Sequence, residues 1–534
     1  MDANLLDTTA AAALLRSHGV QGTDAELSKL INICDGNSSI LERIAVILAN
    51  LADSQASRID EPDVIEAVIQ ELLHSDCDRA LQFYQNYYAK GGYGYNVQRS
   101  DYRFGLRIVS ALQQIDSSSR SESYIINNPE IGFPAIEHDR ALFLTELGEL
   151  KQAETILREL AFSQKKYYYS DGQCKVLYQY AARQNLCDVL VLQGRLREAE
   201  QIADGTIQAY ESDLTIGSSQ TRSESLLSRI TIGERCFMRH RLYSGCNPYA
   251  RRAVALYLQG KIRQALADFK QAEAFSLRKT PSDYLELKVM MRLEKLEQPI
   301  PDWDEMEIPH RTLIGQAAIF YALLLTRLGK LDTALKVLNY SKRCAEHPSN
   351  NLPSMLVCAE VALSDVYRLK GEYELAQQNL EHPLAWAAQT GQQEISCWAH
   401  LSLARLKHAQ NQLAIAQNTV DEACTIATRH GFILYEIDCL VTAGRIALSQ
   451  QDLITAEQKA KAALLSIGDP DMAYAWGHGN TLHLMGEILC KKNNLENAHE
   501  FLTGAAKLRE RIEDPRLLNT KELLSQISPQ IQGN

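Results

Sequence analysis

The sequence lacks the motifs by which most enzymes hold nucleotides, metals or nucleophiles. It contains no G-x-x-x-x-G-K-[ST] phosphate-binding loop, no G-x-S-x-G nucleophile motif and no H-E-x-x-H metal-binding helix. The 13 histidines show no metal-ligand spacing, and His400 and His408, eight residues apart, fit a core-edge or surface role better than a metal site. We therefore predict that the protein is not an enzyme, with no catalytic residues, no metal and no cofactor.

Positive charge and long apolar runs are also scarce. The chain has 55 Lys and Arg against 66 Asp and Glu, a formal net charge of −11. Nucleic-acid binding needs clustered Lys and Arg against the phosphates, so we expect no direct contact with nucleic acid. No apolar run approaches the roughly 18 residues that cross a bilayer, and residues 1–16 lack a signal-peptide pattern. We expect a cytoplasmic protein without membrane contact.

Cysteine pairs and proline are the last absences that matter. The twelve cysteines are scattered, no C-x-x-C occurs, and several lie within helical patterns. They are therefore interpreted as small core residues in a reducing compartment, not as disulfides or a zinc site. Only 14 prolines interrupt a chain rich in Ala and Leu, which favours helix throughout.

What the sequence does contain is a repeated helix–turn–helix corner. Each copy has a small or polar turn residue, then any residue, an apolar residue, two more residues and Ala. The eight corners begin at Gly148, Gly194, Gly260, Gly329, Gly371, Asn411, Gln451 and Asn493. The last five begin at 329, 371, 411, 451 and 493, so their spacing is 40 to 42 residues. Self-similarity at a period of roughly 20–50 residues indicates a solenoid.

Two columns of small residues keep the register of these corners. Seven residues before each corner stand Ala141, Cys187, Ala253, Ala322, Ser364, Ala404, Gly444 and Gly486. After each corner stand Ala153, Ala199, Ala265, Ala334, Ala376, Ala416, Ala456 and Ala498. Small residues facing each other across a tight turn predict two antiparallel helices in close contact, where a larger side chain would overpack. Gly or Asn at the corner suits a left-handed helix end.

This pattern resembles the tetratricopeptide repeat, which carries small residues at the two corresponding positions of its helix–turn–helix unit. The usual unit is about 34 residues, and the longer period here resembles the long-helix variant found in bacterial signalling ATPases of the STAND class. The resemblance implies an all-α, right-handed tetratricopeptide-like α-solenoid with a small helical N-terminal module. In that family the first helix of each pair lines the concave face, which makes Asp365, Arg368, Arg405 and Arg445 candidate contacts for a partner.

Residues 1–74 do not show the repeat. Helices are predicted from Thr8 to His18, from a capping box at Thr23 to Ile33, and from Ile40 to Leu51. Gly36-Asn37 before the third helix resembles the lid of STAND ATPases, although Ser38 stands where that family has Pro. Because no phosphate-binding loop is present, the segment is either the lid of an ATPase whose core lies elsewhere, a stand-alone remnant, or an unrelated helical cap.

Composition divides the chain into five parts. They are an N-terminal module (1–74), a helical transition with a loop (75–136), irregular repeats (137–310), regular repeats (311–508), and a capping helix and tail (509–534).

Two clusters of aromatic and basic residues are candidate partner sites. The first comprises Tyr167, Tyr168 and Arg183. The second comprises Arg235, Arg239, Arg241, Tyr243, Tyr249, Arg251 and Arg252. Arg and Tyr dominate the energetics of protein interfaces, and Arg pairs well with carboxylates. The alternative is that the aromatic rings are core residues and the arginines a solvated helix face.

A curved helical stack offers a long groove that can hold a peptide, a helix or another protein's face. We therefore predict a non-catalytic protein–protein interaction solenoid that works within a larger complex. The resemblance implies a sensor, adaptor or regulatory subunit of a bacterial signalling or defence system. Two alternatives stay open: the C-terminal part of a nucleotide-driven STAND switch, and a scaffold for a stable complex.

Overall fold

The computed structural model describes most of the chain. The described residues are 5–34, 36–61, 64, 67–71, 102–113, 133–163, 168–170, 175–216, 248–277, 308–346, 353–469 and 472–532. The chain divides into two compact units. The first comprises residues 1–143 and 167–170, and the second comprises residues 144–166 and 171–534. Residues 217–247 and 278–307, which belong to the stretch predicted as irregular repeats (137–310), lie outside the described residues.

The first unit begins with a small helical module whose bounds agree with the sequence prediction. It contains α1 (Thr8–Ser17), α2 (Asp24–Ile33), α3 (Ser38–Leu51) and the 3-10 helix η1 (Ala56–Asp60). The predicted capping box is present, because the Thr23 side chain accepts from the backbone N–H of Glu26 and the Glu26 carboxylate accepts from that of Thr23. The same unit contains α7 (Tyr102–Gln113) and the first part of α9 (Phe133–Glu146).

Gly36 and Asn37, on which the resemblance to an ATPase lid rests, both have local structural roles. Gly36 is left-handed at φ +69°, and a Cβ there would lie 2.4 Å from the Leu6 carbonyl oxygen. The Asn37 side chain accepts a 3.1 Å bond from the backbone N–H of Ile40 and so caps α3. The pair therefore has a sufficient explanation in the folding of the module itself.

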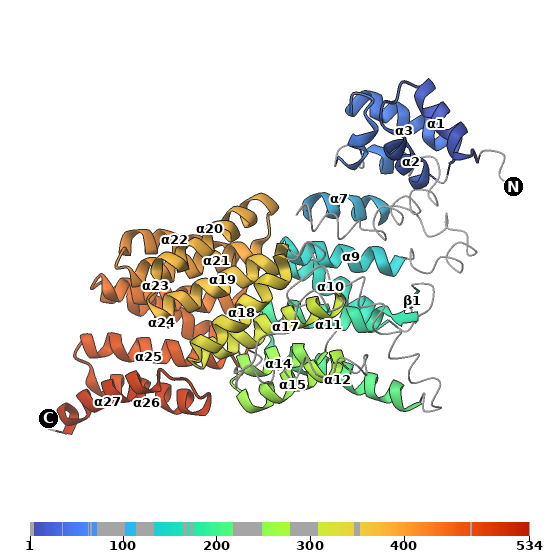
Figure 1. The fold of residues 1–534 in the computed structure, drawn as a ribbon. Helices are drawn as coiled ribbons and strands as arrows, with labels where there is room; N and C mark the ends of the chain where they lie inside the picture. The colour runs from blue at the N-terminus through green and yellow to red at the C-terminus, as the bar shows by residue number, and fades with distance from the viewer. Residues whose placement is uncertain are drawn as a thin grey trace. The chain divides into compact units, whose positions relative to one another are not determined.

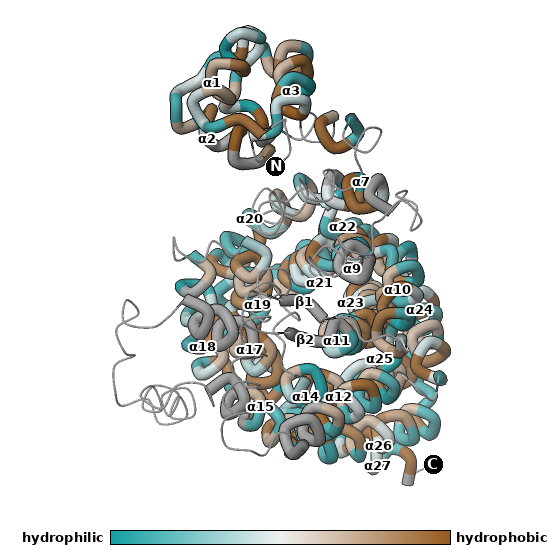
Figure 2. Tube along the Cα trace, turned by 90° about the vertical axis from the view of Figure 1, so that its right-hand side faces the viewer, coloured by the Kyte–Doolittle hydropathy of each residue, from teal (hydrophilic) through white to brown (hydrophobic). Residues whose placement is uncertain are grey.

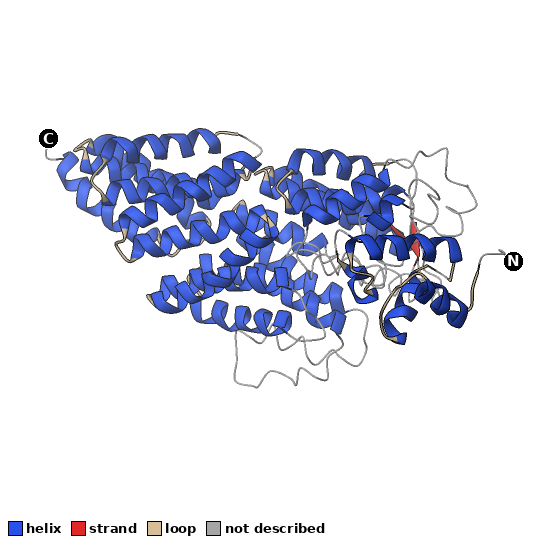
Figure 3. Ribbon diagram, turned by 90° about the horizontal axis from the view of Figure 1, so that it is seen from above, coloured by secondary structure: helices blue, strands red, loops and turns tan. Residues whose placement is uncertain are grey.

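The second unit is an α-solenoid of antiparallel helix pairs (Figures 1 and 3). Each predicted corner joins two helices. After the first corner comes α10 (Leu150–Ala161), and the pairs that follow are α11 (Tyr178–Leu192) with α12 (Leu196–Ile216), α14 (Pro248–Leu258) with α15 (Ile262–Leu277), α17 (Ile308–Arg327) with α18 (Leu331–Glu346), α19 (Pro353–Lys370) with α20 (Tyr373–Thr390), α21 (Gln393–Ala409) with α22 (Leu413–His430), α23 (Ile433–Ser449) with α24 (Leu453–Ile467), and α25 (Ala475–Lys491) with α26 (Leu495–Arg511). Two three-residue strands, β1 (Tyr168–Ser170) and β2 (Lys175–Leu177), precede α11.

The first helix of each pair lies inside the curve of the solenoid and the second lies outside. Figure 2 shows this arrangement for the later pairs, with α18, α20, α22, α24 and α26 around α17, α19, α21, α23 and α25. The inner helices contact one another in sequence, α17 with α19, α19 with α21, and so on to α25. Their inward faces therefore form one continuous surface.

The small-residue columns have the role that the sequence predicts. The Ala residues that follow the eight corners are all buried. At the second corner the Cys187 Sγ lies 3.5 Å from the Ala199 carbonyl oxygen, so side chain touches backbone. A Cβ on Gly486 would lie 2.4 Å from Leu502 Cγ, and one on Gly444 would lie 3.4 Å from the Ala456 carbonyl oxygen, both on the paired helix. Larger residues would force the two helices apart.

The solenoid winds far enough for its early corners to touch its late helices. The Trp476 indole N–H donates a 2.7 Å bond to the Tyr257 carbonyl, across 219 residues of sequence. The Gln392 amide donates to the Glu146 carboxylate at 2.5 Å. We call this contact between successive turns the seam. It encloses the space that the inner helices surround.

The seam explains glycine at the first four corners, but not at Gly371, where nothing lies within 4 Å of the Cβ position. A Cβ on Gly148 would lie 2.5 Å from His430 Nδ1, and one on Gly260 would lie 2.3 Å from Ile512 Cγ2. A Cβ on Gly194 or Gly329 would lie 3.2 Å from the late segment it faces. The last three corners have the same left-handed backbone, at φ 58° to 63°, but carry Asn411, Gln451 and Asn493. The side chain of Asn411 is exposed.

The C-terminal cap differs in detail from the prediction. The second helix of the last pair continues to Arg511, past the expected boundary at 508, and a separate helix, α27 (Leu517–Gln532), follows. The break occurs because Ile512 is fully buried at the seam and Glu513 is left-handed at φ +55°. The Asp514 carboxylate then accepts from the Arg516 backbone N–H and side chain.

Candidate functional site

The inner helices surround a cavity of about 530 Å³, which we call the central cavity. Residues from α11, α14, α17, α19, α21 and α23 line it, together with the segments that enter α25 and α27. The lining includes Val191, Leu192, Val254, Tyr257, Leu258, Leu323, Arg327, Asp365, Arg368, Leu369, Trp398, Leu401, Arg405, His408, Leu434, Tyr435, Asp438, Val441, Thr442, Arg445, Tyr474, Asn480, Pro515 and Arg516. Aliphatic and aromatic side chains alternate there with arginines, a combination typical of binding pockets.

A hydrogen-bonded chain of charged groups crosses one wall of the central cavity. The Arg327 guanidinium donates to the Tyr474 hydroxyl at 3.1 Å, and that hydroxyl donates to Asp438 at 3.1 Å. Asp438 also accepts from Arg405 at 3.0 Å. Burial raises the pKa of Tyr474 well above its usual value, so the phenol stays protonated and remains a donor. The chain therefore links α17, α21, α23 and the segment before α25.

Arg368, on α19, belongs to a second, neighbouring group. It pairs with Asp365 at 3.0 Å, and Asp365 also accepts from the Ser402 hydroxyl at 3.1 Å. Burial alone would raise the pKa of Asp365, but Arg368 and Arg405 outweigh burial and hold it below its usual value. Asp365 is therefore ionised at neutral pH.

Arg445 and Arg516 have their acidic partners outside the lining. Arg445 lies 3.5 Å from Glu487, and Arg516 pairs with Asp514 at 2.8 Å. Asp514 is shared with the fully buried Arg509, at 3.6 Å. Burial first, and then the neighbouring Arg516, lower the pKa of Arg509 to about 10, although Asp514 and Glu487 act in the opposite direction.

The charge of the central cavity is positive, although the whole chain is acidic. Its lining carries five arginines, 327, 368, 405, 445 and 516, against the two carboxylates 365 and 438. Counting Glu487 and Asp514 as well brings in Arg509, which shares Asp514, and leaves six arginines against four carboxylates. Among the lining arginines, Arg327 is the one without an ion pair to a carboxylate within the described residues. Burial first, and then Arg445 and Arg368, lower the pKa of His408, which is consistent with a positive potential.

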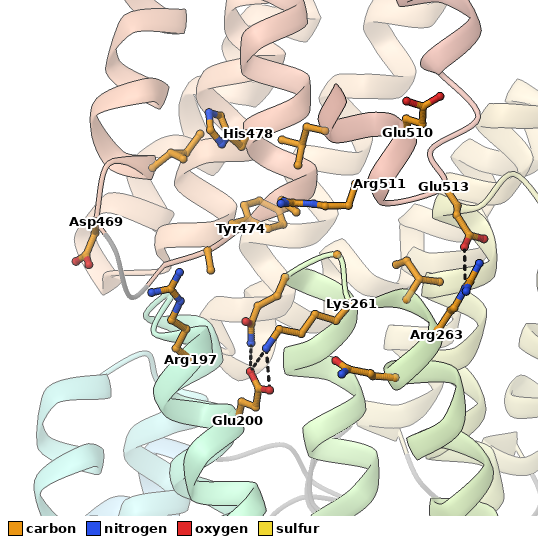
Figure 4. Close-up of a pocket in the computed structure, with 18 of the residues that line it drawn as sticks. Arg197, Glu200, Lys261, Arg263, Asp469, Tyr474, His478, Glu510, Arg511 and Glu513 are labelled. Atoms are coloured by element: carbon orange, nitrogen blue, oxygen red, sulfur yellow. Dashed lines mark hydrogen bonds and ion pairs between the residues drawn. The ribbon is translucent and has the colours of Figure 1, made fainter. Parts of the chain in front are cut away.

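A second hollow, about 1170 Å³ in volume, lies along the seam (Figure 4). Its walls come from α12 and α15 on one side and from α25 and α26 on the other. Lys261 pairs with Glu200 at 2.7 Å, and Arg263 approaches Glu513 at 4.0 Å. Charges of both signs alternate along this cleft, so it has no clear preference for a cation or an anion. We take the central cavity as the stronger candidate.

The structure places three of the predicted partner residues in the central cavity, namely Arg368, Arg405 and Arg445. These are the positions that the repeat resemblance assigned to the concave face. Their individual contributions to binding remain predictions.

Several described members of the two aromatic–basic clusters form contacts within the fold. Arg251 is buried and pairs with Asp188 at 3.0 Å, so it joins α14 to α11. Arg252 pairs with Asp268 and Asp204, both at 2.6 Å, and lies over the ring of Tyr249.

The other cluster members are less informative. Arg183 donates to the Ala161 carbonyl and lies over the Phe162 ring. The backbone of Tyr168 belongs to β1. The remaining members, Tyr167, Arg235, Arg239, Arg241 and Tyr243, lie outside the described residues.

Sequence reasoning missed several lining residues that the repeat register could have found. In three successive repeats the small residue on the inner helix is Ala404, Gly444 or Gly486. The residues six positions before these are Trp398, Asp438 and Asn480, and all three line the central cavity. Arg405 and Arg445 occupy the position directly after that small residue. Applying the register to every inner helix would have identified this stripe. Arg327 and Tyr474 fall outside it, because the seam positions them.

Within the described residues, no group of three or more His, Cys, Asp or Glu side chains is arranged to hold a metal ion. None of the described helices is both long and apolar enough to cross a membrane. Seven cysteines have side chains that the structure describes; five of these are buried, and none of the seven is in a disulfide.

No model of a protein family matches this chain, and a comparison with the curated proteins finds no match. Solved structures with a similar fold do exist. The Rap protein complexed with Competence and Sporulation Factor aligns with a TM-score of 0.42 at 15% identity, over 74% of this chain and 99% of that one. Yeast Tom70 aligns at 0.40 and 11% identity, over 89% and 97%. A STAND protein with a tetratricopeptide repeat sensor, PH0952 from Pyrococcus horikoshii, aligns at 0.36 and 13% identity, over 97% and 77%. The helix pairs described above confirm the predicted all-α solenoid.

Proposed function

We propose that this chain is a non-catalytic recognition module that binds a segment of another protein in the central cavity. The observation that carries the proposal is the cavity itself, which six successive inner helices line with both apolar side chains and ordered arginines. Its volume of about 530 Å³ falls within the roughly 300–1,000 Å³ of ligand pockets. The apolar walls supply binding energy, and the arginines supply orientation.

The arginines are held in place before any ligand arrives. Arg405 is fixed by Asp438, and Arg368 by Asp365. Ordering a long, flexible side chain costs roughly 0.5–1.5 kcal/mol on binding, and this cost is reduced when the side chain is already held. The central cavity thus has the pre-organisation of a binding site.

We further propose that the module serves as a sensor, adaptor or regulatory subunit within a larger complex, in a bacterial signalling or defence system. This wider role rests on the resemblance of the repeats to long-helix tetratricopeptide sensors. The alternative is that the chain is the C-terminal part of a nucleotide-driven switch with its ATPase core elsewhere. Tightly bound nucleotide in the purified protein would favour that alternative.

The test is affinity selection from a synthetic heptapeptide library, with bound peptides identified by mass spectrometry. Leu434 lines the central cavity and is only half-buried, so Leu434→Trp fills the cavity at small cost to the core. Leu465→Trp is the matched control, because Leu465 is 82% exposed on the outer helix α24. We expect wild type and L465W to retain a common set of peptides that L434W loses. Retention of the same set by all three proteins would refute the central cavity as the binding site.

A further inference from the structure

We infer that the segment bound in the central cavity presents a single carboxylate, and that Arg327 receives it. This inference rests on the proposed function and adds the chemistry of the ligand. It assigns a specificity role to a residue that neither the repeat pattern nor the aromatic–basic clusters identified.

Arg327 is the last residue of α17, and the seam holds its guanidinium in position. The guanidinium carbon lies 5.4 Å from the centre of a Trp476 ring and 5.8 Å from that of the Tyr474 ring. Aromatic faces at this distance attract the cation and fix its plane without neutralising its charge. The Tyr474 hydroxyl takes one of its five N–H donors, at 3.1 Å.

Asp438, the nearest carboxylate in this hydrogen-bond network, already accepts hydrogen bonds from other residues. Asp438 accepts from Tyr474 at 3.1 Å and from Arg405 at 3.0 Å. Its hydrogen-bond path to Arg327 runs through the tyrosine hydroxyl, and it acts on the Arg327 charge directly only by electrostatic attraction without an ion pair. Among the described residues Arg327 forms no ion pair with a carboxylate, whereas each of the other four cavity arginines does.

The unpaired guanidinium and the two lining carboxylates then select the ligand group. A carboxylate matches the fork of the Arg327 guanidinium with two parallel hydrogen bonds. A phosphate monoester carries up to two charges at neutral pH, and its second charge would be repelled by Asp365 and Asp438, which also line the cavity. The geometry therefore favours an Asp or Glu side chain, or the carboxylate at the end of a chain.

The position of Arg327 also connects ligand binding to the seam. Trp476, which lies beneath the guanidinium, donates its indole N–H to Tyr257 on the other turn. A carboxylate that holds Arg327 in place therefore supports the group that joins the two turns. We expect ligand binding to stabilise the hydrogen bond between Trp476 and Tyr257.

The test uses the heptapeptide library in two forms, one with a free C-terminal carboxylate and one with a C-terminal amide. The proteins are wild type, Arg327→Gln and, as a control for charge, Arg263→Gln, whose side chain is 94% exposed and lies outside the central cavity. We expect wild type and R263Q to select acidic peptides and R327Q to lose this preference. If the acidic group is a side chain, both library forms give this result. If it is the chain end, only the free-carboxylate form does.

The strongest peptide is then measured by fluorescence anisotropy. Neutralising its carboxylate, as Asn, Gln or the terminal amide, should weaken binding to wild type by at least about tenfold, because a charge-assisted hydrogen bond is lost. The same change should have little further effect on R327Q, since the two groups act as a pair. The comparison of charged and neutralised peptides on wild-type protein remains a valid test even if R327Q is poorly folded. Arg327→Lys keeps the charge, and its affinity for the acidic peptide should lie between those of wild type and R327Q.

The outcomes separate this inference from the proposed function. Peptides that L434W loses but that show no acidic preference would overturn the role of Arg327 and leave the central cavity as the site. An acidic preference that R327Q keeps would also overturn it. Failure to find any peptide that depends on the cavity would overturn both.

Discussion

Replacing Gly260 with alanine tests whether the seam, and not the turn alone, requires glycine at the early corners. Gly260 has φ +79°, and a Cβ there would lie 2.3 Å from Ile512 Cγ2 and 3.0 Å from Ala475 Cβ. Gly371 is the matched control, because its φ of +81° is almost the same and nothing lies within 4 Å of its Cβ position. The two substitutions thus impose the same backbone conformation on alanine and differ only in the seam.

The expected magnitudes follow from these two contributions. A left-handed alanine costs roughly 1–2 kcal/mol at either corner. Overpacking a closed contact adds roughly 1–3 kcal/mol, and only Gly260 faces one. Gly371→Ala should therefore destabilise the protein by about 1–2 kcal/mol and Gly260→Ala by about 2–5 kcal/mol.

The assay is urea unfolding followed by circular dichroism, with midpoints compared among variants because long repeat arrays lose two-state behaviour. A third variant, Ile512→Ala, removes the side chain that the new Cβ would strike. Combined with Gly260→Ala it should recover part of the loss, so the double mutant would be more stable than the two single effects predict. Equal shifts for Gly260→Ala and Gly371→Ala, with no recovery, would show that the seam does not constrain this corner.

Two other predictions concern stability. Asn411 is an exposed corner residue at φ +59°. Because glycine adopts this conformation without strain, Asn411→Gly should raise the urea midpoint and stabilise the protein by up to about 1 kcal/mol. A lowered midpoint would show that the Asn411 side chain supports the turn. Burial lowers the pKa of His138 to about 3 from its usual value near 6.5. Because the unfolded chain takes up this proton more readily, the contribution of His138 is present above pH 6.5 and is lost as the pH falls toward 3, by roughly 1.4 kcal/mol per pH unit. Urea unfolding at pH 7 and pH 5 should therefore show a smaller loss for His138→Gln than for wild type, and identical losses would contradict this origin of acid sensitivity.

The helix pairs could be predicted from the sequence because their interactions are local. Cys187 and Ala199 meet across a turn and are only twelve residues apart, so their sizes are correlated within one short stretch of sequence. The capping box at Thr23 is likewise closed within three residues. Patterns of this range survive in a single sequence, and they gave correct helix bounds to within a few residues.

The candidate site was predicted in part for the same reason. Arg405 and Arg445 follow the small column by one position, and the repeat register alone places them on the inner face. The aromatic–basic clusters were weaker guides, since nearness along the chain says little about exposure. Arg251 and Arg252 are neighbours, yet one is buried against Asp188 and the other is half-buried against Asp268 and Asp204.

The sequence by itself determined the repeating unit: which residues form helices, where each pair turns, and which face of each inner helix points inward. Only the tertiary structure decided how far the stack winds, and with it the seam, the enclosed cavity and the position of Arg327. The physical reason is the range of the contacts. Small increments of rotation from pair to pair accumulate over the whole array, so Trp476 meets Tyr257 across 219 residues through a sum that no single repeat encodes. Glycine at the first four corners is a consequence of this long-range contact, but the sequence does not show the reason until the structure places the two turns side by side.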